Sequence, residues 1–174
     1  MEMGSETLPV SLAELRAWLR LAEVAEENNL LTQVLRTAAE QCAQFIDQKL
    51  LIAACQEDIA ADGYWHQLMH KPVRTITRVE WLDAEGAAQL LPVNSYEMTI
   101  DSEAIGYIRP AYAVSGKIRI SYQAGLAASA EQLPSALRQG ILRLAAYHYA
   151  NRDGSEAPPA AVAALWQPFR RVHL

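Results

Sequence analysis

Cysteine is scarce in this chain of 174 residues, which contains only Cys42 and Cys55. Because these two do not form a paired-cysteine motif, the sequence carries neither a disulfide framework nor a cysteine-based zinc site. Such usage is typical of proteins that stay in a reducing cytoplasm. A chain of this length buries about 70% of its unfolded surface, so one domain needs no disulfide or metal for stability.

Long apolar runs are absent as well. No segment of the sequence reaches the roughly 20 consecutive apolar residues that cross a membrane. Residues 1–6 lack the basic start and the apolar stretch of a secretory signal peptide. We therefore expect a soluble protein that is made in the cytoplasm and has no membrane partner.

Motifs of enzyme chemistry are also missing. The sequence has no Gly-Xaa-Ser-Xaa-Gly motif, its eight glycines form no phosphate-binding loop, and neither cysteine has a recognisable histidine context. The one metal-like spacing is that of His66 and His70, which share a face only if that segment is helical. Residue 67 is glutamine where a zinc protease has glutamate, and Pro72 follows closely. Surface or interface histidines are therefore favoured over a metal-dependent hydrolase. The sequence predicts no catalytic residue, no cofactor and no metal.

Positive charge is in short supply, since the net charge is −5. This argues against a protein that grips DNA phosphates tightly. Residues 1–62 carry eleven acids and four bases, whereas residues 63–174 carry nine acids and eleven bases. Such asymmetry suits an acidic part of one copy facing a basic part of the next in a homo-oligomer. Solvated helix faces are the favoured explanation.

A group of basic side chains in the middle of the chain, interleaved with aromatic residues, is a candidate nucleic-acid surface. The group comprises Arg74, Arg78, Arg109, Lys117 and Arg119, with Trp81 and Tyr107. Outward polar positions of a half-exposed sheet explain the same pattern, and the overall acidity favours this second interpretation.

Helical periodicity dominates residues 11–60. Ser11 and Glu14 form a capping-box pattern at the start of a first helix. A second, longer helix is predicted after the acidic and Asn-rich stretch 26–29, and Cys42 is expected to be a small core residue in it. Its apolar residues recur at the spacing of an amphipathic helix: Leu31, Val34, Leu35, Ala38, Cys42, Phe45, Ile46 and Leu50.

Residues 73–123 change to a period of two, which is typical of half-buried strands. Apolar and polar residues alternate in 96–101 and in 117–122. The run 73–82 is rich in β-branched and aromatic residues, and residues 83–86 supply turn chemistry. The links are too short for crossover helices, so the sheet is expected to be antiparallel.

Helical periodicity returns in residues 132–170. Pro134 suits a first helical turn, and Gly154 suits a helix end. A short helix is predicted over 160–166. The sequence therefore predicts an α+β fold, with residues 1–174 as a single domain. A long N-terminal amphipathic helix and the C-terminal helices form a helical bundle core, into which a small antiparallel β-subdomain is inserted.

Residues 122–126, 133–152 and 168–170 carry short motifs that together resemble those of the phage head–tail connector family. The family has a strand that ends in Tyr-Xaa-Ala-Gly, a helix that runs from Leu-Pro to Tyr-Xaa-Asn-Arg, and a closing Pro-Xaa-Arg. The matching residues here are 122–126, 133–152 and 168–170, with further similarity in 11–19, 71–73, 79–83 and Gly86. The chain departs from the family in its acidic stretch 23–27, and at Trp166-Gln167, where the family often has a Leu-rich segment.

The resemblance implies a ring of identical subunits, commonly twelve, beneath the portal of a DNA-filled head. Such a ring extends the DNA channel, joins the head to a neck or tail-completion protein, and lets DNA pass without specific binding. It also implies assembly in the bacterial cytoplasm and a final place in the neck of a phage or gene transfer agent. The alternative is a small nucleic-acid-binding or regulatory module of a mobile element.

The C-terminal tail is the candidate portal-docking site. Trp166, Phe169, Arg170 and Arg171 combine aromatic and guanidinium groups, which often anchor protein interfaces. The equally favoured alternative is that the tail folds back onto its own core.

Overall fold

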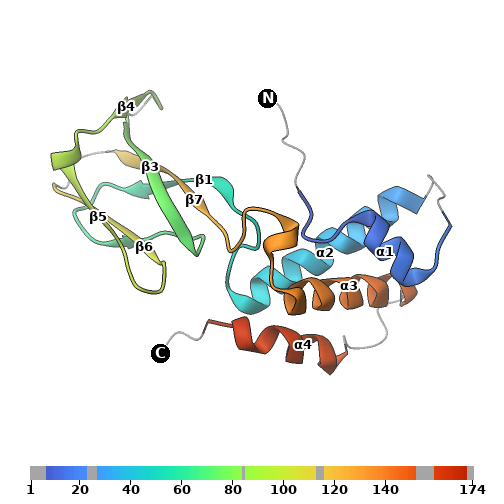
Figure 1. Ribbon diagram of the computed structural model, residues 1–174. Coiled ribbons are helices and arrows are strands. Elements are labelled where there is room, and N and C mark those ends of the chain that lie inside the picture. Colours follow the sequence, from blue (N-terminus) through green and yellow to red (C-terminus); the bar gives the residue numbers. More distant parts are fainter. Residues whose placement is uncertain (1–6, 23–26, 84, 113–115, 152–158, 172–174) are drawn as a thin grey trace. The chain divides into compact units, whose positions relative to one another are not determined.

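The computed structural model describes residues 7–22, 27–83, 85–112, 116–151 and 159–171. The chain divides into two compact units, a helical unit (1–51 with 127–174) and a β unit (52–126). The predicted α+β fold is confirmed, since the described residues contain four α-helices and two small antiparallel sheets (Figure 1). Each unit has its own core of buried apolar residues.

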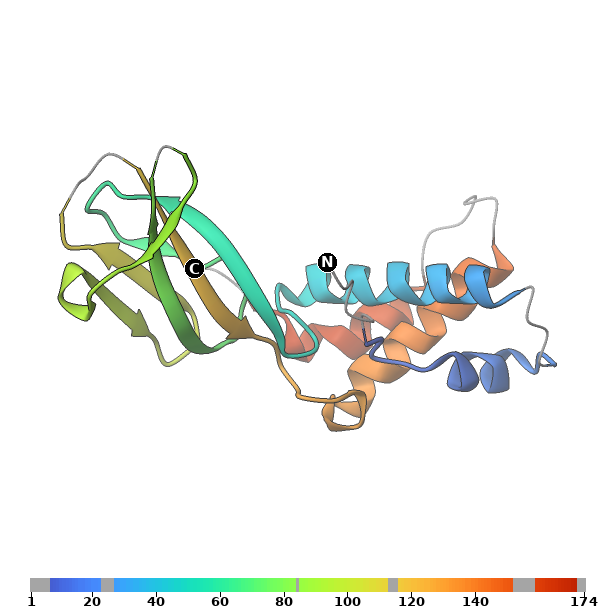
Figure 2. The ribbon, with the colours of Figure 1, turned by 90° about the horizontal axis from the view of Figure 1, so that it is seen from above.

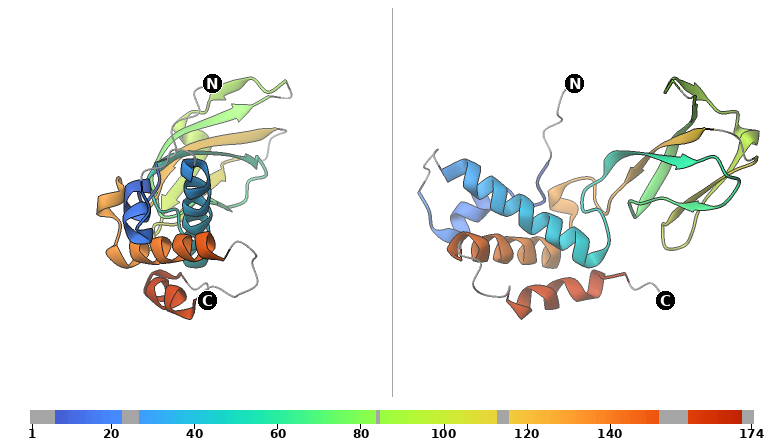
Figure 3. Two further views of the ribbon diagram at one scale, coloured as in Figure 1. Left: turned by 90° about the vertical axis from the view of Figure 1, so that its right-hand side faces the viewer. Right: turned by 180° about the vertical axis from the view of Figure 1, so that it is seen from behind.

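The described part of the helical unit consists of four α-helices and two short 3-10 segments, one before α3 and one after α4. In chain order these elements are α1 (Leu12–Leu19), α2 (Asn28–Ile46), η3 (Ala130–Gln132), α3 (Ser135–Ala150), α4 (Ala160–Trp166) and η4 (Gln167–Phe169). Helix α3 contacts each of the other three α-helices and lies between α2 and α4 (Figure 3). It therefore organises the core of this unit.

The start of α1 is the predicted capping box. The Glu14 backbone N–H donates to Ser11 Oγ at 3.2 Å, and the Ser11 backbone N–H donates to the Glu14 carboxylate at 2.9 Å. Helix α1 ends at Leu19 and is capped by Arg20, which adopts a left-handed conformation with φ 56°. The buried Arg16 guanidinium then donates to Ala22 O and to Asn28 Oδ1, each at 2.6 Å, and so links the end of α1 to the start of α2.

Helix α2 buries most of the predicted apolar stripe, except that Val34 and Phe45 are half-buried and Leu50 lies beyond the end of the helix. Its buried residues are Leu31, Leu35, Ala38, Ala39, Cys42 and Ile46. The thiol of Cys42 is among them, and burial raises its pKa to about 12. The thiol therefore stays protonated and unreactive, as expected for a core cysteine.

The strands of the β unit form two sheets. The larger has the order β1 (Ala53–Ala60), β7 (Lys117–Ala124), β3 (Val73–Leu82) and β4 (Ala88–Leu90). The smaller has the order β2 (His66–Gln67), β6 (Gly106–Pro110) and β5 (Tyr96–Ile100), and the 3-10 turn η2 (Val93–Ser95) precedes β5. Figure 2 shows the long strands of the larger sheet from above.

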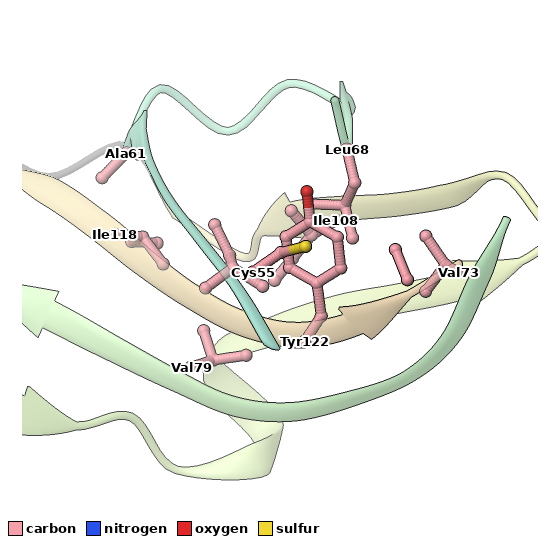
Figure 4. Close-up of a cluster of buried hydrophobic side chains, with 10 residues drawn as sticks. Cys55, Ala61, Leu68, Val73, Val79, Ile108, Ile118 and Tyr122 are labelled. Atoms are coloured by element: carbon pink, nitrogen blue, oxygen red, sulfur yellow. The ribbon is translucent and has the colours of Figure 1, made fainter. Parts of the chain in front are cut away.

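Apolar side chains from both sheets meet in one core. Tyr122 and Ile120 of β7 face Ile108 of β6, and all three are essentially inaccessible to solvent. Cys55 of β1 and Val79 of β3 complete the layer, as the close-up of this cluster shows (Figure 4). The period-two pattern predicted these inward positions on β7 correctly.

Two predicted boundaries are wrong. Residues 53–60, placed in the helical region 11–60, form strand β1, and the β unit begins at residue 52 rather than 73. Helix α2 ends at Ile46 and is capped by Asp47, whose φ of 55° lies in the left-handed region. Strand β1 then pairs with β7 along its full length. Its inward positions are Cys55, Glu57 and Ile59, so a carboxylate interrupts the apolar alternation that would have revealed a strand.

Candidate interaction surfaces

Within the described ranges, no group of three or more His, Cys, Asp or Glu side chains is arranged to hold a metal ion. His66 lies in strand β2 and His70 in the turn that follows, so the helical spacing that would place them on one face is not formed. Instead, His66 Nε2 lies 2.8 Å from the Asp62 carboxylate. Among all the residues that the structure describes, no helix is both long enough and apolar enough to cross a membrane.

The basic residues of the β unit do not form one continuous stripe. Arg109 lies on the smaller sheet, and the other four lie on the larger one. Three of the arginines pair with carboxylates: Arg78 with Glu80 at 3.3 Å, Arg109 with Glu97 at 2.6 Å, and Arg119 with Asp58 at 2.8 Å. Arg74 donates to the backbone oxygen of Gly125 at 2.9 Å. These pairs neutralise the surface that a nucleic acid would need.

The charge asymmetry along the sequence does not follow the two units. The helical unit has eleven acids and nine bases, and the β unit has nine acids and six bases. Their net charges are therefore −2 and −3. The interpretation that an acidic part of one copy faces a basic part of the next finds no counterpart in these units. The charge count divides the sequence at residue 62. This places β1 in the acidic part, although β1 shares a core with strands in the other part.

The C-terminal residues contact the helical unit itself. Trp166 is only 3% exposed, and its ring lies 5.8 Å from that of Phe45 on α2. Its indole N–H donates to the backbone oxygen of Leu137 on α3 at 3.4 Å. A Cβ atom at Gly140 would lie 2.1 Å from the indole nitrogen, so only glycine lets α4 approach α3 this closely. Trp166 is a core residue of this unit.

The residues after Trp166 are held in the same way. The Phe169 backbone oxygen accepts a hydrogen bond from the Gln48 side chain at 2.8 Å, and the Arg171 N–H donates to Ile46 O at 3.2 Å. The exposed Arg170 guanidinium lies 5.6 Å from the centre of the Phe45 ring. These contacts correspond to the second alternative, in which the tail folds back. Portal docking by this tail stays a prediction, with Arg170 as its most accessible group.

The β unit displays most of the large apolar side chains that solvent reaches. Among the described residues nine such side chains are exposed, and eight belong to this unit. They are Tyr64, Trp65, Met69, Leu90, Val93, Met98, Ile100 and Tyr112. None was singled out as a binding residue from the sequence, although the adjacent pair Tyr64-Trp65 beside turn residues was a usable signal.

One buried polar contact ties β1 to the turn after β2. The Tyr122 hydroxyl accepts from the His70 backbone N–H at 3.2 Å and lies 3.4 Å from the Glu57 carboxylate. That carboxylate also accepts from the Met69 N–H at 3.2 Å. Burial of the phenol raises the pKa of Tyr122, with the Glu57 charge adding to the effect. The hydroxyl therefore stays protonated and fixes the turn that carries Met69.

Comparison with known proteins gives one kind of match. No family model and no curated protein matches the chain. Solved structures do match. A chain in the neck of an empty gene transfer agent (GTA) particle, computed with C6 symmetry, is 26% identical, with a TM-score of 0.80. The match covers 100% of this chain and 94% of that one.

Two further solved structures agree. In the neck of a native GTA particle computed with C12 symmetry, a chain is 27% identical with a TM-score of 0.76, covering 100% of this chain and 94% of that chain. In the virion of a native GTA particle, a chain is 28% identical with a TM-score of 0.74, covering 94% and 90%.

The fold and these matches define a class of protein, the structural proteins of phage-like particles. Within it, the likeness supports a head–tail adaptor-type protein of the GTA kind. The resemblance to the connector family predicted from the sequence is thereby confirmed.

Proposed function

We propose that the chain is a structural, non-enzymatic subunit of the neck of a phage-like particle. Copies form a ring beneath the portal, extend the DNA channel and join the head to the next neck or tail-completion protein. The observation that carries this proposal is the likeness to chains of GTA necks over the full length of this protein. The C6 and C12 symmetry of those necks supports a ring of identical copies, which we take to be twelve.

The electrostatics of both units suit a channel wall. Each unit is net negative, and three of the arginines on the sheets are paired with carboxylates. A wall of this kind binds phosphates weakly, so DNA passes without being held. The subunit is made in the bacterial cytoplasm and ends in the neck of the particle.

The portal is contacted by the surface around η4. Trp166 and Phe169 hold this short segment against α2 and α3, and Arg170 projects from it as an exposed cation. Arg171 follows directly. A guanidinium on a rigid support loses little side-chain freedom when a carboxylate or aromatic ring of a partner binds it.

The docking surface is tested by one charge reversal. Deletion of residues 165–174 also removes Trp166 from the core, so a loss of docking would be confused with a loss of folding. Arg170→Glu avoids this, and Arg20→Glu, at another exposed position of the same unit, is the matched control. We expect the first variant to dock at least tenfold more weakly and the control to dock normally. Equal docking of both variants contradicts this role for the tail.

The function itself is tested by electron microscopy of the protein mixed with the portal protein from the same genetic locus. We expect an added ring of density below the portal. A portal that stays bare at high protein excess contradicts the proposal. Salt-dependent DNA affinity would then be the next measurement, because it is the mark of a nucleic-acid-binding module.

A further inference from the structure

The two sheets of the β unit leave two open edges. Strand β4 ends the larger sheet and β5 ends the smaller one, and the short link 91–95 joins them. At the opposite end of each sheet order lie β1 and β2, which residues 61–65 join. The strand orders therefore place the β4–β5 edge and the β1–β2 edge at opposite ends of the two sheets.

The β4–β5 edge exposes side chains that occupy inward positions. Met98 pairs in register with the fully buried Ile108, yet Met98 is 51% exposed. Ile100 pairs with the buried Gly106 and is also exposed. Leu90 at the end of β4 and Val93 in the link are more exposed still. The inward-facing side chains of β5 therefore lie outside the core, whereas those of its neighbour β6 are covered by it.

The β1–β2 edge exposes a second, different apolar patch. It consists of Tyr64 and Met69, each 73% exposed, and Trp65. Hydrogen bonds hold the backbone beneath two of these side chains. The Tyr64 N–H donates to the Asp62 carboxylate at 3.0 Å, and the Met69 N–H donates to Glu57.

Trp65 is fixed by its side chain. The Arg109 guanidinium lies 5.1 Å from the centre of its ring, and Arg109 is in turn paired with Glu97. Exposed apolar residues on such defined supports bind a partner with little loss of conformational freedom.

We propose that these two edges are the two halves of one subunit interface, and that the β4–β5 edge of one copy contacts the β1–β2 edge of the next. This inference rests on the proposed ring. A closed ring needs a head-to-tail contact between two different surfaces of the same chain. Two apolar patches at opposite ends of the two sheets meet that requirement, whereas a single external partner would need only one of them. The occupant of each edge is therefore a second copy of this chain.

The edge contact also explains why β5 ends its sheet without protection. An exposed edge strand with apolar side chains is a hazard in a monomer, because it pairs with other chains. A ring that closes covers every such edge once and leaves none for further association. The apolar residues at both edges are then interface residues rather than a defect of the fold.

The proposal is tested with charges placed on the two edges. Met98→Glu and Tyr64→Lys alter exposed positions, so each variant folds, as circular dichroism will show. In electron microscopy with the portal, each single variant is expected to form rings at least tenfold less often than the parent. The double variant is expected to form rings again, because every contact then joins the introduced carboxylate of one copy to the introduced ammonium group of the next. Trp18→Lys, a change at an exposed apolar position of the helical unit and so on neither edge, is the control and should form rings normally.

Crosslinking supplies a second, independent readout. Copies with Met98→Cys are mixed with copies carrying Tyr64→Cys and treated with a short bismaleimide. The native Cys42 and Cys55 are buried and do not interfere. We expect covalent dimers in the mixture and none in either variant alone.

The outcomes separate the inference from the proposed function. A parent protein that forms no ring overturns both. Rings that persist in Met98→Glu, or dimers formed by Met98→Cys copies alone, overturn the edge interface and leave the neck function standing.

Discussion

In the helical unit the Trp166 ring of α4 is buried against α3, whereas in the β unit Tyr64 is 73% exposed. Both units have a core of buried apolar residues, but they differ in how far their remaining large apolar side chains are exposed. The helical unit has one exposed large apolar residue among those described, Trp18, and the β unit has eight. A unit that covers its own apolar surface is suited to act as a scaffold. One that leaves apolar edges open is suited to contact other chains.

Polar contacts follow the same division. In the helical unit they close the unit on itself, as Arg16 does between α1 and α2 and Gln48 does at the tail. In the β unit they support turns that face outward, as the Glu57 carboxylate does beneath Met69. The comparison predicts that substitutions in the helical unit act on stability, whereas those at the β edges act on assembly.

The largest effect on stability is expected from Trp166→Ala. The change removes a buried indole between α2, α3 and α4 and leaves a cavity, which costs about 3–5 kcal/mol. The free energy of unfolding from urea titrations followed by circular dichroism measures this loss. Trp18→Ala, at a position 47% exposed in the same unit, is the control and should change it by about 0.5 kcal/mol or less. Equal losses for both variants contradict the core role of Trp166.

Gly140→Ala is expected to have the next largest effect on stability, and to destabilise the protein where this exchange usually stabilises a helix. In a helix interior this exchange normally stabilises by about 0.5–1 kcal/mol. Here the new methyl group would collide with the Trp166 indole, and overpacking of this kind costs about 1–3 kcal/mol. A double-mutant cycle isolates the cause. In a Trp166→Ala background the collision is gone, and Gly140→Ala should stabilise. A loss of the same size in both backgrounds contradicts the steric explanation.

The β unit has a buried polar contact whose loss should cost less. Tyr122→Phe removes the hydroxyl that accepts from His70 N–H and leaves that N–H unpaired, at a cost of about 1–2 kcal/mol. Urea titrations followed by intrinsic fluorescence measure the change. Tyr112→Phe, at a position 75% exposed, should be neutral to within about 0.5 kcal/mol. If Tyr122→Phe is as neutral as this control, the hydroxyl does not stabilise the turn.

The sequence predicted the elements whose periodicity is strong and unbroken. The apolar stripe of α2, the strand 73–82 and the helix 160–166 are confirmed, the last two with the predicted bounds. The capping box at Ser11 is also confirmed, because its two hydrogen bonds depend only on residues three apart. The expected terminator Gly154 lies outside the described residues.

The local sequence pattern did not predict strands whose positions depend on contacts with residues far away in the sequence. Strand β1 has a carboxylate at an inward position, where Glu57 meets Tyr122, and this contact spans 65 positions along the chain. Strand β2 is only two residues long. The edge surface was missed for a related reason. Met98 looks like an ordinary inward residue from its alternation, and only the sheet order reveals that β5 extends past its cover.

The smallest predicted effect concerns pH and distinguishes the two units once more. Burial lowers the pKa of His148 on α3, where Nε2 lies 3.0 Å from Gln41 Oε1 of α2. The unfolded chain therefore takes up this proton at a higher pH than the folded one. The helical unit accordingly loses stability as the pH falls below about 6.5, the ordinary histidine value.

His148→Gln should remove that part of the pH dependence between pH 8 and pH 5. The Tyr122→Phe variant, altered only in the β unit, should keep it. A pH profile unchanged by His148→Gln would show that the imidazole is not desolvated between α2 and α3. The closed character of the helical unit would then rest on the packing of Trp166 against Gly140 and on the Arg16 and Gln48 hydrogen bonds.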